Sequence, residues 1–124
     1  MSENSKSNNR KKGSWSENLV DKYLKKQGHK IISKNFRSPL GEIDIIFWDH
    51  DEIVFSEIKS RTSLKYGFPV ESVTFRKKQH IIRTARYFLH LHHLEDCHIR
   101  FDIIEVYLYK NQKPIIHPIQ NVFW

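Results

Sequence analysis

The chain has 124 residues, of which 39% are hydrophobic and 28% charged, a composition typical of one globular domain and not of a disordered chain. Its formal net charge of +7 is compatible with a polyanionic partner, either nucleic acid or an acidic membrane surface. The single cysteine, Cys97, excludes an internal disulfide, and no apolar run reaches the roughly 18 residues that a membrane helix needs. The chain does not open on a secretory signal pattern, so we expect a cytoplasmic protein without membrane contact.

The N-terminal segment differs in composition from the rest. Residues 1–12 are rich in Ser, Asn and Lys and carry four basic residues against one acid, so we expect a disordered basic tail there. A single α/β domain is expected over 13–124. It opens with a helical pattern in which Ser14 fits an N-cap, Glu17 completes a capping box, and Gly28 ends the helix.

Two short polar turns divide the next segment into three strands. We expect these strands over 29–36, 41–48 and 52–61, separated by "RSPLG" and "DHDE". Connections this short join antiparallel neighbours, because a parallel crossover needs a dozen or more residues. The three strands should therefore form a meander.

The second half of the chain predicts a long helix and two strands. A helical pattern runs over roughly 70–92, a fourth strand over 99–109, and a short edge strand over 115–119, where a proline is tolerated. The resulting order of helix, three strands, helix and strand predicts an α/β fold with helices flanking a mixed sheet.

Charged side chains stand inside two of the predicted strands. Glu57 and Lys59 share one face of the third strand, and pairing across the "DHDE" turn can bring Asp44 of the second strand close to Glu57. Two adjacent carboxylates repel unless a cation lies between them, and carboxylate oxygens suit Mg²⁺ or Mn²⁺. Such an ion, with Lys59 beside it, could promote phosphodiester hydrolysis. The alternative is that Glu57 and Lys59 are an ordinary edge-strand charge pair.

Longer stretches carry a resemblance to a known family. The segment from "GSWSENLVDKY" through "GEIDIIFWDHDEIVFSEIKSR", followed by "GFPVESV" and "RFDIIEV", resembles the YraN family of small bacterial proteins. The resemblance covers about Gly13 to Val106. It implies a restriction-endonuclease-like fold of the PD-(D/E)xK type, similar in core layout to archaeal Holliday junction resolvases.

The resemblance also implies roles for single residues. Asp44 takes the aspartate place of the nuclease motif, Glu57 the acidic place and Lys59 the lysine place. Asp44, Glu57 and the backbone carbonyl of Ile58 would hold Mg²⁺ or Mn²⁺. Glu17 matches a glutamate that adds a ligand or positions water in resolvase-like members, although capping remains its alternative role. The residue before Asp44 is Ile43, where the motif has proline.

The implied activity is that of a magnesium-dependent endodeoxyribonuclease, with branched or structured DNA among its candidate substrates and a homodimer as the expected assembly. The alternative is a non-catalytic nucleic-acid-binding protein or assembly factor on the same fold, and a third reading is an interaction protein with no nucleic-acid role. Basic residues on the long helix and in flanking loops are candidate phosphate contacts: Arg37, Lys65, Arg76, Lys77, Arg83 and Arg86.

Two acids keep open roles at this point. Glu42 could support the metal site or face outward as a surface acid. Asp102 could join the site, form a salt bridge with Arg100 or have a role in a turn.

Overall fold

A computed structural model of the chain describes residues 2–61 and 74–123. Two helices and five strands follow one another in the order α1 (Ser2–Lys26), β1 (Lys30–Ser38), β2 (Gly41–Asp49), β3 (Glu52–Arg61), α2 (Phe75–Leu91), β4 (His98–Tyr107) and β5 (Ile115–Ile119). Neither helix, within these described residues, combines the length and the apolar character that crossing a bilayer requires.

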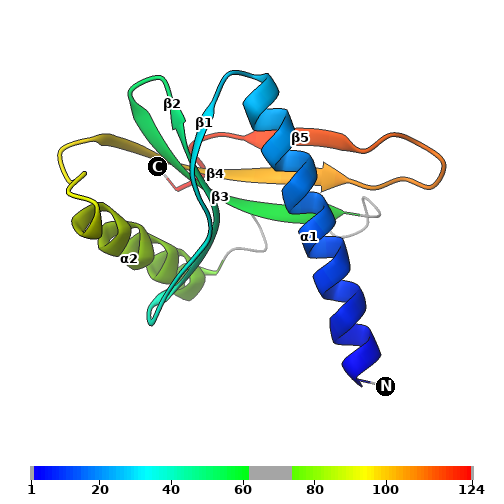
Figure 1. Cartoon of the computed structure of the whole chain (residues 1–124). Helices are drawn as coiled ribbons and strands as arrows, with labels where there is room; N and C mark the ends of the chain where they lie inside the picture. The colour runs from blue at the N-terminus through cyan, green and yellow to red at the C-terminus, as the bar shows by residue number, and fades with distance from the viewer. Residues whose placement is uncertain (1, 62–73, 124) are drawn as a thin grey trace.

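The five strands form one mixed sheet in the order β1-β2-β3-β4-β5 (Figure 1). The predicted meander is confirmed, because β1 pairs antiparallel with β2, and β2 antiparallel with β3. β4 lies parallel to β3, and β5 returns antiparallel along β4. The parallel pair follows from the long connection that contains α2, which is the kind of crossover that parallel strands need.

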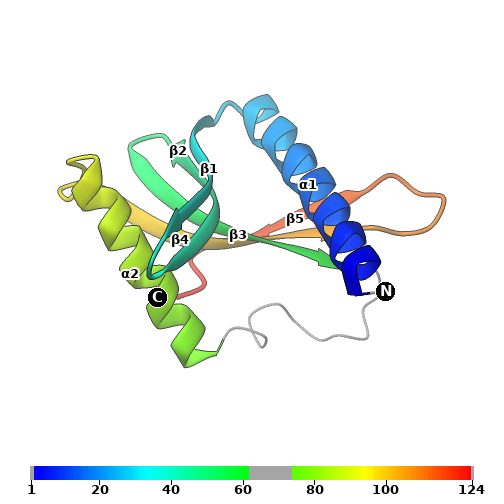
Figure 2. The same cartoon turned by 60° about the horizontal axis from the view of Figure 1, so that its bottom comes forward.

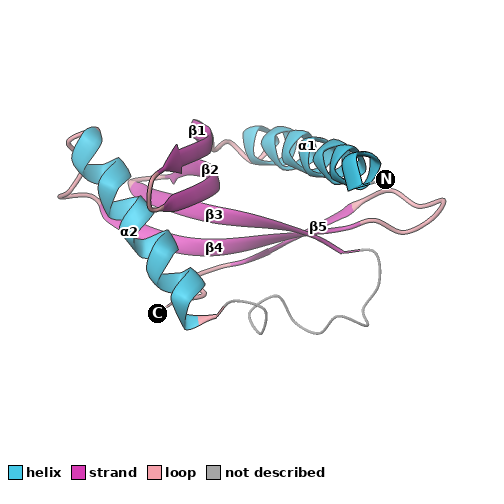
Figure 3. Ribbon diagram, turned by 90° about the horizontal axis from the view of Figure 1, so that it is seen from below, coloured by secondary structure: helices cyan, strands magenta, loops and turns pink. Residues whose placement is uncertain are grey.

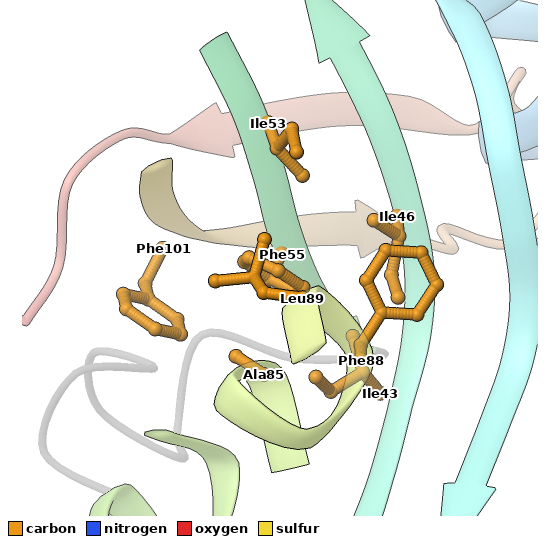
Figure 4. Close-up of a cluster of buried hydrophobic side chains, with 8 residues drawn as sticks. All are labelled: Ile43, Ile46, Ile53, Phe55, Ala85, Phe88, Leu89 and Phe101. Carbon is orange, nitrogen blue, oxygen red and sulfur yellow. The ribbon is translucent and has the colours of Figure 1, made fainter. Parts of the chain in front are cut away.

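The two helices cover opposite faces of the sheet, as the view along its edge shows (Figure 3). One apolar cluster lies between the sheet and α2, with Ile46, Phe55 and Phe101 from the strands packed against Phe88 from the helix (Figure 4). The rings of Phe55 and Phe88 meet edge to face with centroids 5.9 Å apart. A second cluster on the other face joins α1 to the sheet: Val20, Leu24, Ile45, Phe47, Val54, Ile104 and Val106. The predicted α/β architecture with flanking helices is therefore confirmed.

Both helices start at positions other than the predicted ones. α1 begins at Ser2, so Ser14 lies within the helix and does not cap it. Glu17, the second half of the predicted capping box, instead accepts a hydrogen bond from Asn35 of β1 at 2.9 Å. α2 begins at Phe75 because the hydroxyl of Thr74 accepts the N–H of Lys77 at 3.2 Å and caps the helix. The first predicted residues of this helix, 70–73, lie outside the described residues.

The tip of the β1–β2 hairpin lies beside α2 (Figure 2). Gly41 has a φ of +152° there, and a Cβ at this position would stand 3.0 Å from Oγ1 of Thr84. Glycine therefore permits both the backbone conformation and the close approach to the helix. This contact brings the start of β2 against the same helix that packs on the sheet.

Arg100 ties the far end of the sheet together. Its guanidinium donates two hydrogen bonds to Asp102, at 2.9 and 3.0 Å, and one to Asp49 at 2.9 Å. A fourth bond reaches Glu52 at 3.1 Å, so the β2–β3 turn is fixed to β4. Of the alternative roles for Asp102, the salt bridge with Arg100 is confirmed.

Truncating Phe88 tests the packing of α2. We expect Phe88→Ala to lower the free energy of unfolding by about 3–5 kcal/mol, since the side chain is fully buried and its removal leaves a cavity. Chemical denaturation followed by circular dichroism measures the change. Tyr87→Ala is the matched control, because the neighbouring ring is 43% exposed and should cost far less. Equal losses in the two variants would contradict the described packing.

Candidate metal and phosphate site

Two hydrogen bonds between a side chain and the backbone join β2 and β3 where their pairing ends. The paired register of these strands ends with Ile45 opposite Ser56, so Asp44 and Glu57 are the next residues outward. The hydroxyl of Ser56 donates to the carbonyl of Ile45 at 2.8 Å. One carboxylate oxygen of Asp44 accepts the N–H of Ile58 at 2.8 Å. The carboxylate of Asp44 is thus held between the two strands.

An open pocket of about 260 Å³ lies beside this point. Three acidic side chains line it, Glu42 and Asp44 from β2 and Glu57 from β3. The α2 side of the pocket and the hairpin tip supply the rest of the lining: Gly41, Lys77, His80 and Ile81. The predicted approach of Asp44 to Glu57 is therefore found in the structure, and Glu42 joins them.

The acids crowd one another electrostatically. Burial, and then the negative charges of Glu57, Glu17 and Glu42, raises the pKa of Asp44 to about 6, although the hydrogen bond from Ile58 works in the opposite direction. A carboxyl group in this state is costly to ionise. A positive group nearby would stabilise the ionised form of Asp44.

Two lysines supply positive charge at Glu57. Nζ of Lys77 lies 2.6 Å from Oε1 of Glu57, and Nζ of Lys59 lies 3.4 Å from the same oxygen. Burial, and then the adjacent Lys77, lowers the pKa of Lys59, while Glu57 opposes this shift. Because its pKa is lowered, a larger fraction of Lys59 carries an unprotonated amine at a given pH than an exposed lysine does.

Glu17 approaches the site from α1 rather than lining the pocket. Its charge contributes to the raised pKa of Asp44, which places it within electrostatic reach of that carboxylate. The hydrogen bond that Asn35 of β1 donates to Glu17 fixes the orientation of the Glu17 carboxylate. Ile58 contributes its N–H to Asp44, and its carbonyl, the predicted ligand, stays a prediction.

The donor atoms fit a hard divalent cation. Asp44 and Glu57 offer carboxylate oxygens from neighbouring strands, and Oε2 of Glu57 is buried and has no hydrogen-bond partner. No three His, Cys, Asp or Glu side chains form a ready ligand group within residues 2–61 and 74–123. Mg²⁺ commonly takes only one or two protein carboxylates and completes its shell with water and phosphate, so two such ligands are sufficient.

The predicted phosphate contacts fall into separate groups. Arg76, Arg83 and Arg86 are exposed on α2 and have no acidic partner within the described part of the chain. Arg37 is exposed on β1 and lies 3.3 Å from Glu42. Lys77 contacts Glu57, and Lys65 lies outside the described residues.

Sequence reasoning missed the contribution of α2 to the pocket. His80 was not among the candidate residues, although it stands three residues after Lys77 and so shares a helix face with it. Lys77 itself was expected to contact phosphate, and its contact with Glu57 follows only from how α2 packs on the sheet. The sequence feature that could have indicated this contact is the absence of acidic residues from the first turn of α2.

The raised pKa of Asp44 predicts a pH-dependent stability. The folded protein holds this proton more tightly than the unfolded chain, whose carboxyl has the ordinary pKa of 3.8. The destabilising effect of the ionised carboxylate is therefore absent below about pH 4, grows between pH 4 and 6, and is complete above pH 6.

Asp44→Asn should remove this destabilisation and still accept the N–H of Ile58. We expect the variant to be more stable than wild type at pH 8 in EDTA by up to about 3 kcal/mol, with the difference vanishing near pH 4. Urea unfolding at several pH values measures it. Asp96→Asn, at an exposed turn position, is the control. A difference that does not vary with pH would contradict the assignment.

Comparison with known proteins places the chain in a family. The model of the uncharacterised protein family UPF0102 matches residues 16–106. A UPF0102 protein of Clostridioides difficile is 46% identical over 116 residues, which cover 94% of this chain and 99% of that protein. Another from Caldicellulosiruptor saccharolyticus is 43% identical over 117 residues, with the same coverage of both chains. A third, from Clostridium acetobutylicum, is 45% identical and covers 93% of this chain and 95% of its own. The chain therefore belongs to the UPF0102 family, which is the YraN family that its motifs resemble.

Proposed function

We propose that this protein is a divalent-metal-dependent endonuclease that hydrolyses phosphodiester bonds in DNA. The observation that carries the proposal is one open pocket lined by Asp44, Glu57 and Lys77, with Lys59 also beside Glu57. The element order and the acids at the diverging ends of β2 and β3 also support a restriction-endonuclease-like fold. We extend that fold assignment to this chain as part of the proposal.

Each residue has a role in this proposal. Asp44 and Glu57 would hold Mg²⁺ or Mn²⁺, which would supply positive charge to the phosphate as negative charge develops on it. Lys59 stands against Glu57 and would orient the attacking water or accept its proton. The water oxygen bonds to phosphorus while the bond from phosphorus to one sugar oxygen breaks, and that oxygen takes up a proton. Glu17 and Glu42 would orient water or the metal from either side.

The surface around the pocket supports a nucleic-acid substrate. Arg76, His80 and Arg83 recur at helical spacing on one flank of α2, and His80 lines the pocket. A second hollow continues from His80 along the hairpin tip, lined by residues from Arg37 to Glu42. Basic groups at such positions contact phosphates without reading bases, so the proposed substrate is selected by shape and not by sequence.

A cleavage assay tests the proposal. Wild type should nick supercoiled plasmid or cut branched DNA in Mg²⁺ or Mn²⁺, and EDTA should stop the reaction. Asp44→Asn and Lys59→Met should each lower the rate by about 100-fold or more, because each removes a group that acts on the reacting phosphate. Glu95→Gln removes an exposed carboxylate at another position and should cleave as wild type does.

The pattern among the variants separates the proposal from its rivals. Equal cleavage by all four proteins would point to a contaminating nuclease. No cleavage, with DNA binding that persists in EDTA and in Asp44→Asn, would favour the second candidate, a non-catalytic nucleic-acid-binding protein. The exposed arginines of α2 support that candidate independently of the acids.

Nucleic-acid binding has a prediction of its own. Replacing Arg76, Arg83 and Arg86 together by Gln should weaken DNA binding at 100 mM salt by at least tenfold. The slope of the logarithm of the binding constant against the logarithm of the salt concentration should become shallower, by the equivalent of about two to three phosphate contacts. Fluorescence anisotropy on a labelled duplex at several salt concentrations measures both. An unchanged salt slope would mean that these exposed arginines do not meet the backbone.

A further inference from the structure

Lys77 and Glu57 form an unusually short ion pair. At 2.6 Å it is the shortest ion pair among the described residues, and it joins the first turn of α2 to β3. The same oxygen, Oε1 of Glu57, also lies 3.4 Å from Lys59. This oxygen is thus engaged by lysine, while Oε2 of Glu57 is buried without a hydrogen-bond partner.

The position of Lys77 in the first turn of α2 does not stabilise the helix itself. The N-terminal end of a helix carries partial positive charge and favours acids, yet the first turn of α2 contains none. Although burial lowers the pKa of Lys77, its contacts with Glu57 and Lys59 and the charge of Asp44 raise it overall. The ammonium is therefore stabilised by the acids of the pocket and not by its own helix.

Lys77 and a metal ion that binds Oε1 of Glu57 are alternatives. Lys77 lines the same pocket as Asp44 and Glu57, and its side chain is 40% exposed, so it can withdraw toward solvent. A divalent cation that used both oxygens of Glu57, or Oε1 alone, would have to take the place of this ammonium. Both cations neutralise the same pair of carboxylates.

We propose that Lys77 is a built-in competitor for the metal, holding Asp44 and Glu57 in place without it and leaving Glu57 when a divalent cation binds. The inference rests on the proposed metal site but not on catalysis. Lys77 is thus a positioning residue, and the affinity of the free protein for metal is lower than its two carboxylates alone would give.

Metal titration tests this competition. Mn²⁺ binding is measured by the electron paramagnetic resonance signal of the free ion, at one pH and salt concentration. Lys77→Met should bind Mn²⁺ about tenfold or more tightly than wild type, and adding Asp44→Asn should abolish that gain. Lys78→Met is the matched control, since it removes the same charge one residue along α2, where Lys78 lies 5.5 Å from the ring of Phe123.

Three results of the titration would overturn the inference. They are a Lys77→Met protein that binds Mn²⁺ no more tightly than wild type, one in which no binding is detected, and an equal gain in Lys78→Met. A gain confined to Lys77→Met without any DNA cleavage would refute the proposed nuclease and keep the competition. DNA cleavage by the wild type, without a gain in Mn²⁺ affinity in Lys77→Met, would support the proposed nuclease and refute the competition.

A second measurement uses the unaltered chain and does not depend on how the variants fold. Acylation of lysines by an amine-reactive ester, read by mass spectrometry, should increase at Lys77 by several-fold when Mn²⁺ is added, because the amine leaves its ion pair. Lys78 should keep its reactivity. Labelling of Lys77 that is unchanged or reduced by Mn²⁺ would contradict displacement.

Discussion

The repulsion between Asp44 and Glu57 is the constraint on which the rest of the site depends. These carboxylates come from neighbouring strands and line one pocket, and burial together with the charge of Glu57 makes Asp44 harder to ionise. The fold tolerates them because it surrounds them with donors and cations. The N–H of Ile58 bonds to Asp44, and Lys77 and Lys59 meet Glu57. A site maintained against this cost is more easily explained by function than by stability.

Several structural features converge to create the pocket. The pairing of β2 and β3 ends at Ser56, whose hydroxyl donates to the carbonyl of Ile45. Gly41 lets the hairpin tip approach Thr84, so that α2 forms one wall. At the other end of the strands, Arg100 fixes the β2–β3 turn to β4. The sheet is therefore held firmly at the turn and opens at the acids, which leaves them accessible to solvent and to a partner.

Short-range signals in the sequence predicted the three-stranded meander and allowed the acid pair. The turns between β1, β2 and β3 are too short for anything but antiparallel pairing, and the "DHDE" turn fixes which residues of β2 and β3 face each other. The sequence therefore permitted the closeness of Asp44 and Glu57, and the observed register of β2 and β3 establishes it. The same holds for the short edge strand at 115–119, whose bounds agree with those of β5.

Contacts between distant elements could not be predicted in this way. The position of Lys77 against Glu57 depends on how α2 packs across the sheet, which is decided by Phe88 and its partners and not by any local motif. The capping box at Ser14 and Glu17 was a valid local pattern, but α1 continues through it and Glu17 bonds to Asn35 of β1 instead. In both cases tertiary packing decided between roles that the local sequence left open.

Anomalous diffraction from a crystal grown with Mn²⁺ would locate the ion relative to the two carboxylates. We expect an anomalous peak in contact with the carboxylates of both Asp44 and Glu57, with the ammonium of Lys77 withdrawn from Oε1 of Glu57. A crystal saturated with Mn²⁺ that shows no peak at these carboxylates, and keeps Lys77 against Glu57, would contradict this expectation.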